Sequence, residues 1–336
     1  MSMVINEKSP NSPRNRKTAE KIGSNNEVFD NSKDVSAPVS GRELKTNAVS
    51  TDKCTTAGDP VNVATGSFYI EAVDLVIEDR GMDLNITRRY NSIESNVGIM
   101  GMGWVFEYQT HLNIDEDKIS LVYPDGHIKE FKKIDSVWTN QTDEDRSDIL
   151  MEDSAGFILT TGKKLTYRYD ENGRLTSISD RNGNTVSLEY NKNGEIDAVI
   201  SPGGKILTFL YKDGKICHIT DNIGRKVIYN YIGDNLAEVT LPNGGTVRYT
   251  YENDRITKVT DQNGITYVEN EYDEKGRVIK QYDSDGNLTK IEYDDEKWEN
   301  TFTYCATGVV EKYRYNERTL VTEKVFKDGT SEKYTY

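Results

Sequence analysis

The chain has 336 residues, of which 56 are acidic and 42 are basic, so its formal net charge is −14. This charge disfavours a protein that binds nucleic acid through a basic surface, and no run approaches the roughly 18 apolar residues that a membrane-spanning helix needs. With 21 Tyr, 8 Phe and 3 Trp, wholesale disorder is disfavoured too, because that much aromatic surface is unfavourable in water.

The N-terminal segment 1–57 is predicted to be a disordered polar tail. It is rich in Asn, Ser, Lys, Thr and Asp, and its scattered apolar residues follow no period. No apolar core of about 7–15 residues follows the first residues, so we expect no standard secretory signal. The alternative is an adaptor segment that becomes ordered on a partner, such as a secretion apparatus.

Internal repeats dominate the second half of the chain. A tyrosine recurs in eight consecutive steps of 20 to 22 residues. Such regularity indicates that each step is one structural unit stacked on its neighbours. The repeated tyrosines are Tyr169, Tyr190, Tyr211, Tyr231, Tyr251, Tyr272, Tyr293, Tyr315 and Tyr336.

Each unit is interpreted as a β-hairpin of about 21 residues. A polar turn follows each tyrosine, then a short strand, a second turn and a strand that alternates apolar and polar residues, as in Val227, Tyr229 and Tyr231. The apolar residues of the first strand are three apart, as in Leu175 and Ile178, which predicts a bulge there. Positive φ is expected at several of the turn glycines. These are Gly173, Gly183, Gly194, Gly214, Gly224 and Gly264.

The hairpins predict an all-β fold, a long coiled antiparallel sheet in which the repeated tyrosines are inward anchors. A β-propeller is the competing architecture, with pairs of units as blades, but alternate units show no odd–even difference. We expect a tail at 1–57, a pre-repeat β domain at 58–104, degenerate repeat strands at 105–168 and eight repeats at 169–336. Within 105–168, residues 123–127 are interpreted as a hairpin turn and residues 142–148 as a solvated loop.

The sequence Tyr-Asp-x-x-Gly-Arg-Leu at 169–175, followed by Asp-x-x-Gly, resembles the YD repeat of the Rhs and teneurin families. The pattern is nearly intact at 272–278 and almost lost between Tyr293 and Tyr315, where we expect Trp298 near the Leu site. Segments 58–68, 84–92 and 101–104 resemble the domain that precedes these repeats in bacterial Rhs proteins. The motif residues singled out there are Gly58, Asp59, Pro60, Gly66, Gly103 and Trp104.

The resemblance implies a structural function without catalysis. In the polymorphic toxin systems of this family, the repeats wind into a hollow shell around a toxin domain that lies C-terminal to them. We therefore expect a segment of such a shell, an open one, whose further repeats and toxin domain lie outside this chain. The expected location is the cytoplasm before export, then the outside or the surface of the cell by a route without a standard signal peptide.

No catalytic residue, cofactor or metal site is predicted. The three histidines have no Ser, Cys or carboxylate partner at an informative spacing, and the three cysteines fit neither a disulfide framework nor a metal site. Cys217 and His218 adjoin, but neighbours on a strand point to opposite faces. The residues considered are His111, His127, His218, Cys54, Cys217 and Cys305.

Acidic turns are interpreted as structural. The Asp-x-x-Gly elements lack calcium-loop spacing, so we expect the Asp side chain to close the turn. Asp294, Asp295 and Glu296 are adjacent, which gives no cleft for a pair of glycosidase carboxylates. The alternative function is a carbohydrate- or cell-surface-binding module whose rows of tyrosines stack on sugars.

Overall fold

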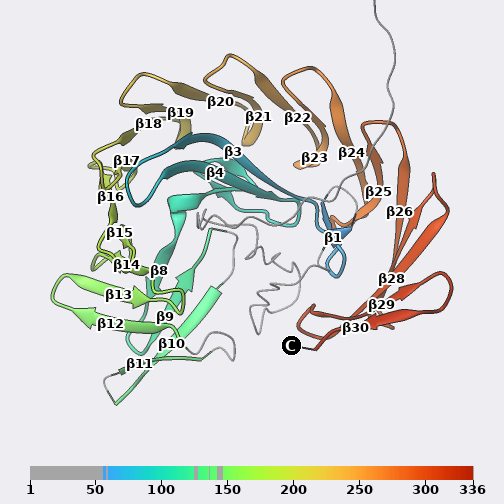
Figure 1. Cartoon of the computed structure of the whole chain (residues 1–336), viewed down its shortest axis with the longest axis horizontal. Coiled ribbons are helices and arrows are strands. Elements are labelled where there is room, and N and C mark those ends of the chain that lie inside the picture. The colour runs from blue at the N-terminus through green and yellow to red at the C-terminus, as the bar shows by residue number, and fades with distance from the viewer. Residues whose placement is uncertain (1–55, 58–59, 125–127, 136, 142–146, 336) are drawn as a thin grey trace, which may run out of the picture. The chain divides into compact units, whose positions relative to one another are not determined.

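The fold is given by a computed structural model, which describes residues 56–57, 60–124, 128–135, 137–141 and 147–335 (Figure 1). The predicted tail 1–57 lies outside the described residues except for β1 (Thr56–Ala57), which pairs with β2 (Val61–Asn62). Gly58, Asp59, Cys54, His127 and Tyr336 lie outside them as well. In the part of the chain that is described, no helix has the length and hydropathy to cross a membrane.

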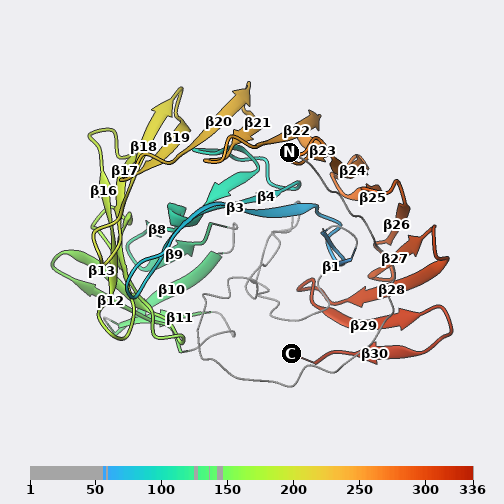
Figure 2. The same cartoon turned by 45° about the horizontal axis from the view of Figure 1, so that its top comes forward.

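One antiparallel sheet of 23 strands, β8 to β30, contains the repeats. Each strand pairs with the next one in the sequence, and Figures 1 and 2 show the sheet curving around the strands that precede it. The prediction of a long coiled sheet of hairpins is confirmed. The strands before the repeats are β8 (His111–Ile114), β9 (Lys118–Val122), β10 (Ile128–Ile134), β11 (Val137–Asn140), β12 (Ile149–Asp153), β13 (Gly156–Thr160) and β14 (Thr166–Tyr169).

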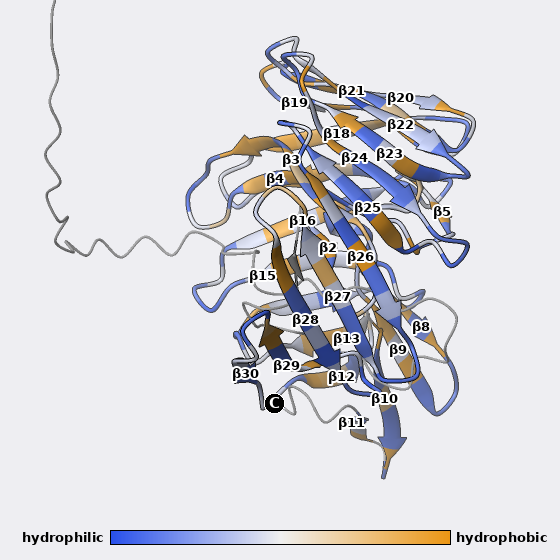
Figure 3. Ribbon diagram, turned by 90° about the vertical axis from the view of Figure 1, so that its right-hand side faces the viewer, coloured by the Kyte–Doolittle hydropathy of each residue, from blue (hydrophilic) through white to orange (hydrophobic). Residues whose placement is uncertain are grey.

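The repeat hairpins follow as eight units, which we number from the hairpin after Tyr169. Buried and exposed residues alternate along their second strands, as in β20, where Val227 and Tyr229 are buried and Ile228 and Asn230 are exposed. Figure 3 shows the resulting mixture of hydrophobic and hydrophilic residues along the strands. The strands are β15 (Leu175–Ser179), β16 (Thr185–Tyr190), β17 (Ile196–Ile200), β18 (Ile206–Lys212), β19 (Lys215–Asp221), β20 (Lys226–Ile232), β21 (Asn235–Thr240), β22 (Thr246–Glu252), β23 (Arg255–Thr260), β24 (Thr266–Tyr272), β25 (Val278–Asp283), β26 (Leu288–Asp294), β27 (Glu299–Tyr304), β28 (Val309–Tyr315), β29 (Val321–Phe326) and β30 (Ser331–Lys333).

The predicted bulge occurs in the first strand of seven units. Tyr190 pairs with Ile196 while Glu189 pairs with Ala198, so Asp197 is the extra residue. The same register shift occurs after Tyr169, Tyr211, Tyr231, Tyr251, Tyr272 and Tyr315.

Unit 7, between Tyr293 and Tyr315, is regular instead. Tyr293 pairs with Asn300 without a shift, and Trp298 lies in the preceding turn with φ 57°. The expectation that Trp298 stands near the Leu site is therefore wrong. Because unit 7 has no bulge, the pairing register of β26 and β27 does not shift, and Asn300 lies opposite Tyr293.

The turns are closed by Asp and Asn side chains, as predicted. Asp170 Oδ1 accepts the N–H groups of Asn172 at 3.0 Å and Arg174 at 2.9 Å. All six turn glycines singled out in the sequence have positive φ, between 74° and 88°. The same pair of hydrogen bonds recurs at Asp180, Asn191, Asp221, Asp261, Asp273, Asp283 and Asn316.

The strands that precede the large sheet form what we call the N-terminal domain. Its main sheet has the order β3 (Tyr69–Ile77), β4 (Leu84–Asn91), β7 (Trp104–Phe106), and β5 (Val97–Gly98) pairs with β6 (Gly101–Met102). The 3₁₀ helix η2 (Glu107–Gln109) leads into β8. In Figures 1 and 2, β3 and β4 lie on the inner side of the curved repeat sheet.

Two predicted loops differ in outcome. Strands β9 and β10 pair through Val122 and Ile128, as the predicted hairpin requires, although residues 125–127 of its turn lie outside the described residues. The interpretation of 142–148 as a solvated loop is wrong at Asp148, and residues 142–146 are not described. Asp148 is buried and forms a 2.5 Å ion pair with the buried Lys129, because a charge that leaves water needs a partner of opposite sign.

The start of the sheet predicts a difference between two turn glycines. At Gly173 (φ 78°), a Cβ would collide with the Leu112 carbonyl of β8, whereas a Cβ at Gly183 (φ 83°) would meet nothing within 4 Å. Gly183→Ala should cost about 1 kcal/mol of backbone strain. Gly173→Ala should cost at least about 1 kcal/mol more, because it also displaces β8 from a native backbone hydrogen bond. Urea denaturation measures both, and equal losses would contradict the importance of the contact between β8 and this turn.

The Asp turns predict a loss of stability in acid. The pKa of Asp180 is lowered first by the Asn184 side chain, that of Asp261 by the Ile265 N–H, and that of Asp283 by the Asn287 side chain. Since a lowered carboxyl pKa stabilises the fold only above the unfolded value, stability should fall as the pH drops below about 4. Urea midpoints at a series of pH values measure this loss.

The matched variant replaces these three aspartates with Asn, which keeps the acceptor oxygen, as Asn191 does in unit 2. Its urea midpoint should depend less on pH between 5 and 2. An unchanged pH dependence would contradict the assignment to the turns.

Candidate functional site: the face between the N-terminal domain and the repeats

The closing tyrosine of a unit, the last residue of its hairpin, bonds to the residue that opens the same hairpin. In six units its hydroxyl donates to the carbonyl oxygen of the opening residue, at 2.5 to 3.1 Å. This contact joins the two strands at the end of the hairpin where the bulge interrupts regular pairing. We call the set the tyrosine ladder. Its pairs are Tyr190–Leu175, Tyr211–Ile196, Tyr231–Ile216, Tyr251–Leu236, Tyr272–Ile256 and Tyr293–Val278.

The rings of the ladder are half-buried and pack against the core. Burial raises the pKa of the Tyr190 hydroxyl to about 12, so the hydroxyl stays a donor at neutral pH. Tyr169, before unit 1, is buried and lies 3.3 Å from the Thr110 hydroxyl, and the Tyr315 ring lies against Trp298. The fully inward residues stand two positions before the closing tyrosines and include Leu188, Phe209, Tyr229 and Tyr249.

Segment 60–112 contacts seven of the eight units. Residues from different parts of this segment contact consecutive hairpins, in an order that does not follow the sequence of the segment, so the segment braces the inner side of the sheet (Figure 1). From unit 1 to unit 7 the contacts are Leu112–Gly173, Asp79–Ser201, Ile99–Ile216, Met102–Asp234, Tyr90–Ile256, Gly66–Val278 and Val63–Asn300.

Three of these contacts use the same backbone group of the repeat. The N–H of the opening residue donates to the N-terminal domain in unit 3 (Ile216 to the Ile99 carbonyl, 2.8 Å), unit 5 (Ile256 to the Tyr90 hydroxyl, 3.0 Å) and unit 6 (Val278 to the Gly66 carbonyl, 2.9 Å). The carbonyl of the same residue accepts the tyrosine of the ladder. Domain and ladder therefore satisfy the two sides of one peptide segment beside the bulge.

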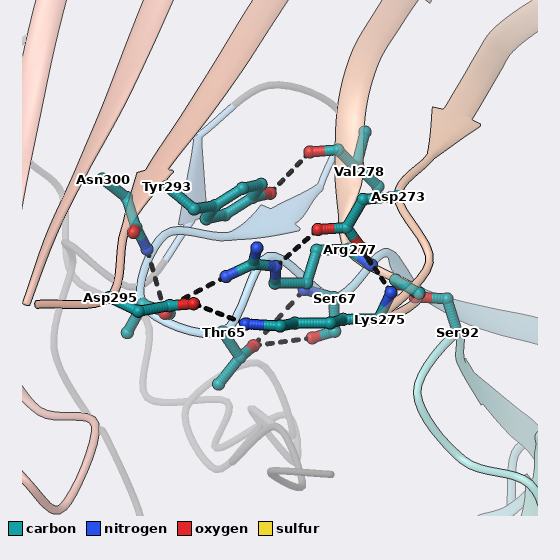
Figure 4. A network of polar contacts seen from close by, with 12 residues as sticks. Thr65, Ser67, Ser92, Asp273, Lys275, Arg277, Val278, Tyr293, Asp295 and Asn300 are labelled. Carbon is teal, nitrogen blue, oxygen red and sulfur yellow. Dashed lines mark hydrogen bonds and ion pairs between the residues drawn. The ribbon is translucent and has the colours of Figure 1, made fainter. Parts of the chain in front are cut away.

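The loop around Gly66 docks on unit 6 (Figure 4). Gly66 has φ 73°, and a Cβ there would collide with the Tyr293 ring, so both the conformation and the close approach require glycine. Beside it, Arg277 stacks 4.0 Å above the Tyr293 ring and pairs with Asp273 at 2.8 Å and Asp295 at 2.9 Å. The predicted acidic turn thus includes a carboxylate that pairs with Arg277.

Asn300 fixes the same loop from unit 7. Its side chain is fully buried, and Nδ2 donates to the carbonyl oxygens of Val63 at 2.8 Å and Ala64 at 3.0 Å. Figure 4 shows Asn300 reaching the loop beside Tyr293. At this position, which is apolar in the other units, the loop carbonyls thereby satisfy the NH2 group of the amide, while its buried Oδ1 has no hydrogen-bond partner among the described residues.

A buried ion pair lies at the middle of the face. Arg88 of β4 pairs with Asp74 of β3 at 2.8 Å, and both side chains are at most 3% exposed. The repeats supply two hydroxyls: Tyr229 donates to Asp74 at 2.9 Å, and Arg88 donates to Tyr249 at 2.8 Å. Burial alone would lower the pKa of Arg88, but the charge of Asp74 holds it above its ordinary value.

Two of the described pre-repeat motif residues, Gly66 and Trp104, contact the repeats at this face. Trp104 is buried, stacks under the Arg88 guanidinium at 4.4 Å and donates from Nε1 to the Tyr251 hydroxyl at 2.9 Å. Gly103 has φ 69°, and the Pro60 carbonyl accepts the Tyr69 N–H. Sequence reasoning missed Asp74, Arg88 and Asn300, although a charge inside the apolar strand 69–77 is a signal for Asp74.

Cys217 and His218 do not point to opposite faces, contrary to the prediction. The Cys217 Sγ lies 3.9 Å from His218 Nδ1, because Cys217 is the extra residue of the bulge in β19, where side chains do not alternate. His111 is exposed and contacts the Gln109 carbonyl. Within the described ranges, no three His, Cys, Asp or Glu side chains are grouped as metal ligands.

Comparisons with known proteins match both parts of the chain. The family model described as "Domain of unknown function (DUF6531)" matches residues 58–131, and the RHS Repeat model matches 158–185, 169–206 and 229–266. The tRNA nuclease WapA of Bacillus subtilis (strain 168) is 28% identical over 138 residues, and the tRNA3(Ser)-specific nuclease WapA of Bacillus spizizenii is 27% identical. The match covers 40% of this chain and 6% of either relative.

Solved structures of a much larger protein also align. The crystal structure of TcdB2-TccC3 without its hypervariable C-terminal region aligns with a TM-score of 0.32 and 9% identity, covering 80% of this chain and 19% of that one. The Photorhabdus luminescens Tc holotoxin pore aligns with a TM-score of 0.23 and 10% identity, over 80% and 20% of the two chains.

The buried ion pair predicts unequal effects at two adjacent arginines. Arg88→Met should cost about 3–5 kcal/mol, because Asp74 would remain buried without its cation. The matched control is Arg89→Met, which breaks an equally short pair with Glu71 whose side chains are 18% and 29% exposed, and it should cost up to about 1 kcal/mol. Urea denaturation measures both. Similar losses for the two variants would contradict the role of the buried pair.

Proposed function

Because the chain is a member of the RHS-repeat family with a DUF6531 domain before its repeats, we propose that it is a non-catalytic wall segment of a shell that encloses a toxin domain and helps to deliver it. The observation that carries the proposal is the continuous curved sheet of hairpins braced from inside by the N-terminal domain. A wall of this kind needs stiffness and length rather than a reactive centre.

The contacts support a structural function for the repeats. The recurring positions hold the wall together, since the tyrosine hydroxyls bond to backbone carbonyls in six units and Asp and Asn side chains close many of the turns. The relatives named as tRNA nucleases share with this chain a region that makes up 6% of their length. We assign nuclease activity in such proteins to the rest of the chain.

The proposal includes partners and a location. The enclosed toxin domain and further repeats are the expected covalent partners, and the N-terminal region would contact a secretion apparatus or an adaptor. The protein would be made in the cytoplasm and exported, to the outside or the cell surface, by a route without a standard signal peptide. Carbohydrate binding by the tyrosines is the weaker alternative, because their hydroxyls are engaged and their rings half-buried.

The test extends the chain by the coding sequence that follows Tyr336 in its own gene. We expect further repeats followed by another domain. That domain should resist protease at least about tenfold longer when attached to the shell than when expressed alone, which corresponds to about 1.4 kcal/mol in the free energy of exposing it to the protease. Equal digestion in the two settings, or a gene that ends here, would contradict the proposal. The chain of residues 1–336 serves as the catalytic control and should leave total tRNA intact.

A further inference from the structure

Several contacts between the N-terminal domain and the repeats do not distinguish one unit from another. The opening-residue amides at Ile216, Ile256 and Val278 are backbone groups that every unit has. The Trp104 indole donates to the hydroxyl of Tyr251, and every unit has a closing tyrosine at the same position. These contacts stabilise docking, but they would be nearly as good with the sheet displaced by one whole unit.

One contact at unit 2 does distinguish the units. Ser201 donates its hydroxyl to the Asp79 carboxylate, and the Gly203 N–H donates to the same oxygen at 2.7 Å. At the position of Ser201, units 1 and 3 carry Asp180 and Asp221, which would repel Asp79.

Gly203 in this turn also distinguishes unit 2 from its neighbours, because only a residue without a Cβ leaves room for Asp79. A Cβ at Gly203 would collide with the Asp79 carboxylate. The corresponding residues of units 1 and 3 are Asn182 and Ile223, both of which have a Cβ. Of these three units, unit 2 is therefore the one whose turn neither repels the charge of Asp79 nor collides with its carboxylate.

The buried ion pair makes a second distinction. Asp74 and Arg88 need hydroxyls at two successive inward positions, and Tyr229 and Tyr249 supply them. The preceding inward residue is Phe209 and the following one is Asn270. A displacement by one unit in either direction would deprive Asp74 or Arg88 of its tyrosine hydroxyl while the group stays buried.

Asn300 makes the third distinction. It supplies the donors for the Val63 and Ala64 carbonyls, whereas the opening residues of the adjacent units are Val278 and Val321. Valine has no side-chain donor. The loop carbonyls would therefore lose both hydrogen bonds after a displacement by one unit.

We propose that Ser201, Gly203, Tyr229, Tyr249 and Asn300 are specificity-determining residues, which we call the register residues. They select which repeat unit docks at each point of the N-terminal domain, while the recurring positions supply contacts common to all units. This inference goes beyond the proposed function, because it concerns how a chain of similar hairpins folds against its own domain in a single alignment. It holds whatever the wall encloses.

The test measures distances between spin labels in the full chain. One label is placed at Ser95→Cys in the N-terminal domain, and the second at Thr208→Cys in unit 2 or Glu292→Cys in unit 6, all exposed positions. A displacement by one unit moves the domain by two strands, about 10 Å. Movement toward the C-terminal units should lengthen the first distance and shorten the second. The native cysteines Cys54, Cys217 and Cys305 are replaced with Ser.

Two pairs of substitutions make the next unit an equal competitor. Asp221→Ser with Ile223→Gly gives unit 3 the turn that Asp79 recognises. Tyr229→Phe with Asn300→Val removes the other two preferences for the native alignment. Each pair alone is the control for the other, and each should keep the native distances, because the remaining register residues still favour the native unit.

The combined variant should show a second population displaced by about 10 Å, of opposite sign for the two label pairs. Native distances alone in this variant would overturn the proposal. A combined variant that fails to fold while both pairs fold would overturn it as well, since the recurring contacts are held to suffice for docking in either alignment.

Discussion

The structure depends on how the backbone is satisfied beside the bulge of each hairpin. The extra residue in the first strand shifts the register at the opening residue, whose N–H and C=O must then find partners, because an unpaired buried peptide group is costly. The closing tyrosine supplies a donor for the carbonyl, and in three units the N-terminal domain supplies an acceptor for the amide. The repeated tyrosine and the docked domain therefore both provide hydrogen-bond partners for the backbone beside the bulge.

The buried ion pair ties the domain and the repeats into one folding unit. Arg88 and Asp74 neutralise each other within the N-terminal domain. Burial of such a pair is tolerable only with further hydrogen bonds, and the repeats supply two of them. Tyr229 donates to Asp74 across 155 residues of sequence, and Tyr249 accepts from Arg88 across 161. Both tyrosines belong to the repeats, so the hydrogen bonding of this buried pair depends on the contact between the domain and the repeats.

Local patterns predicted the hairpins, the bulges and the turn chemistry, because each follows from spacing within about 21 residues. The 3-residue spacing of Leu175 and Ile178 indicated the bulge, and Asp170 closes its turn as expected. The partners of Asp74 and Asn300 could not be predicted, since residues 155 and 237 positions away leave no trace in a local pattern. The same bulge that was predicted explains why Cys217 and His218 meet.

A repeated sequence can extend a sheet, but it cannot by itself define where a second domain docks. Every recurring group offers the same contact once per unit, so alignments that differ by whole units would have similar energies. Differences between units remove this degeneracy, and here they lie in unit 2, in the second strands of units 3 and 4, and in unit 7. Because the distinguishing contacts are spread along the face, a wrong alignment would disturb all three at once, and the cost of each contact adds to the others.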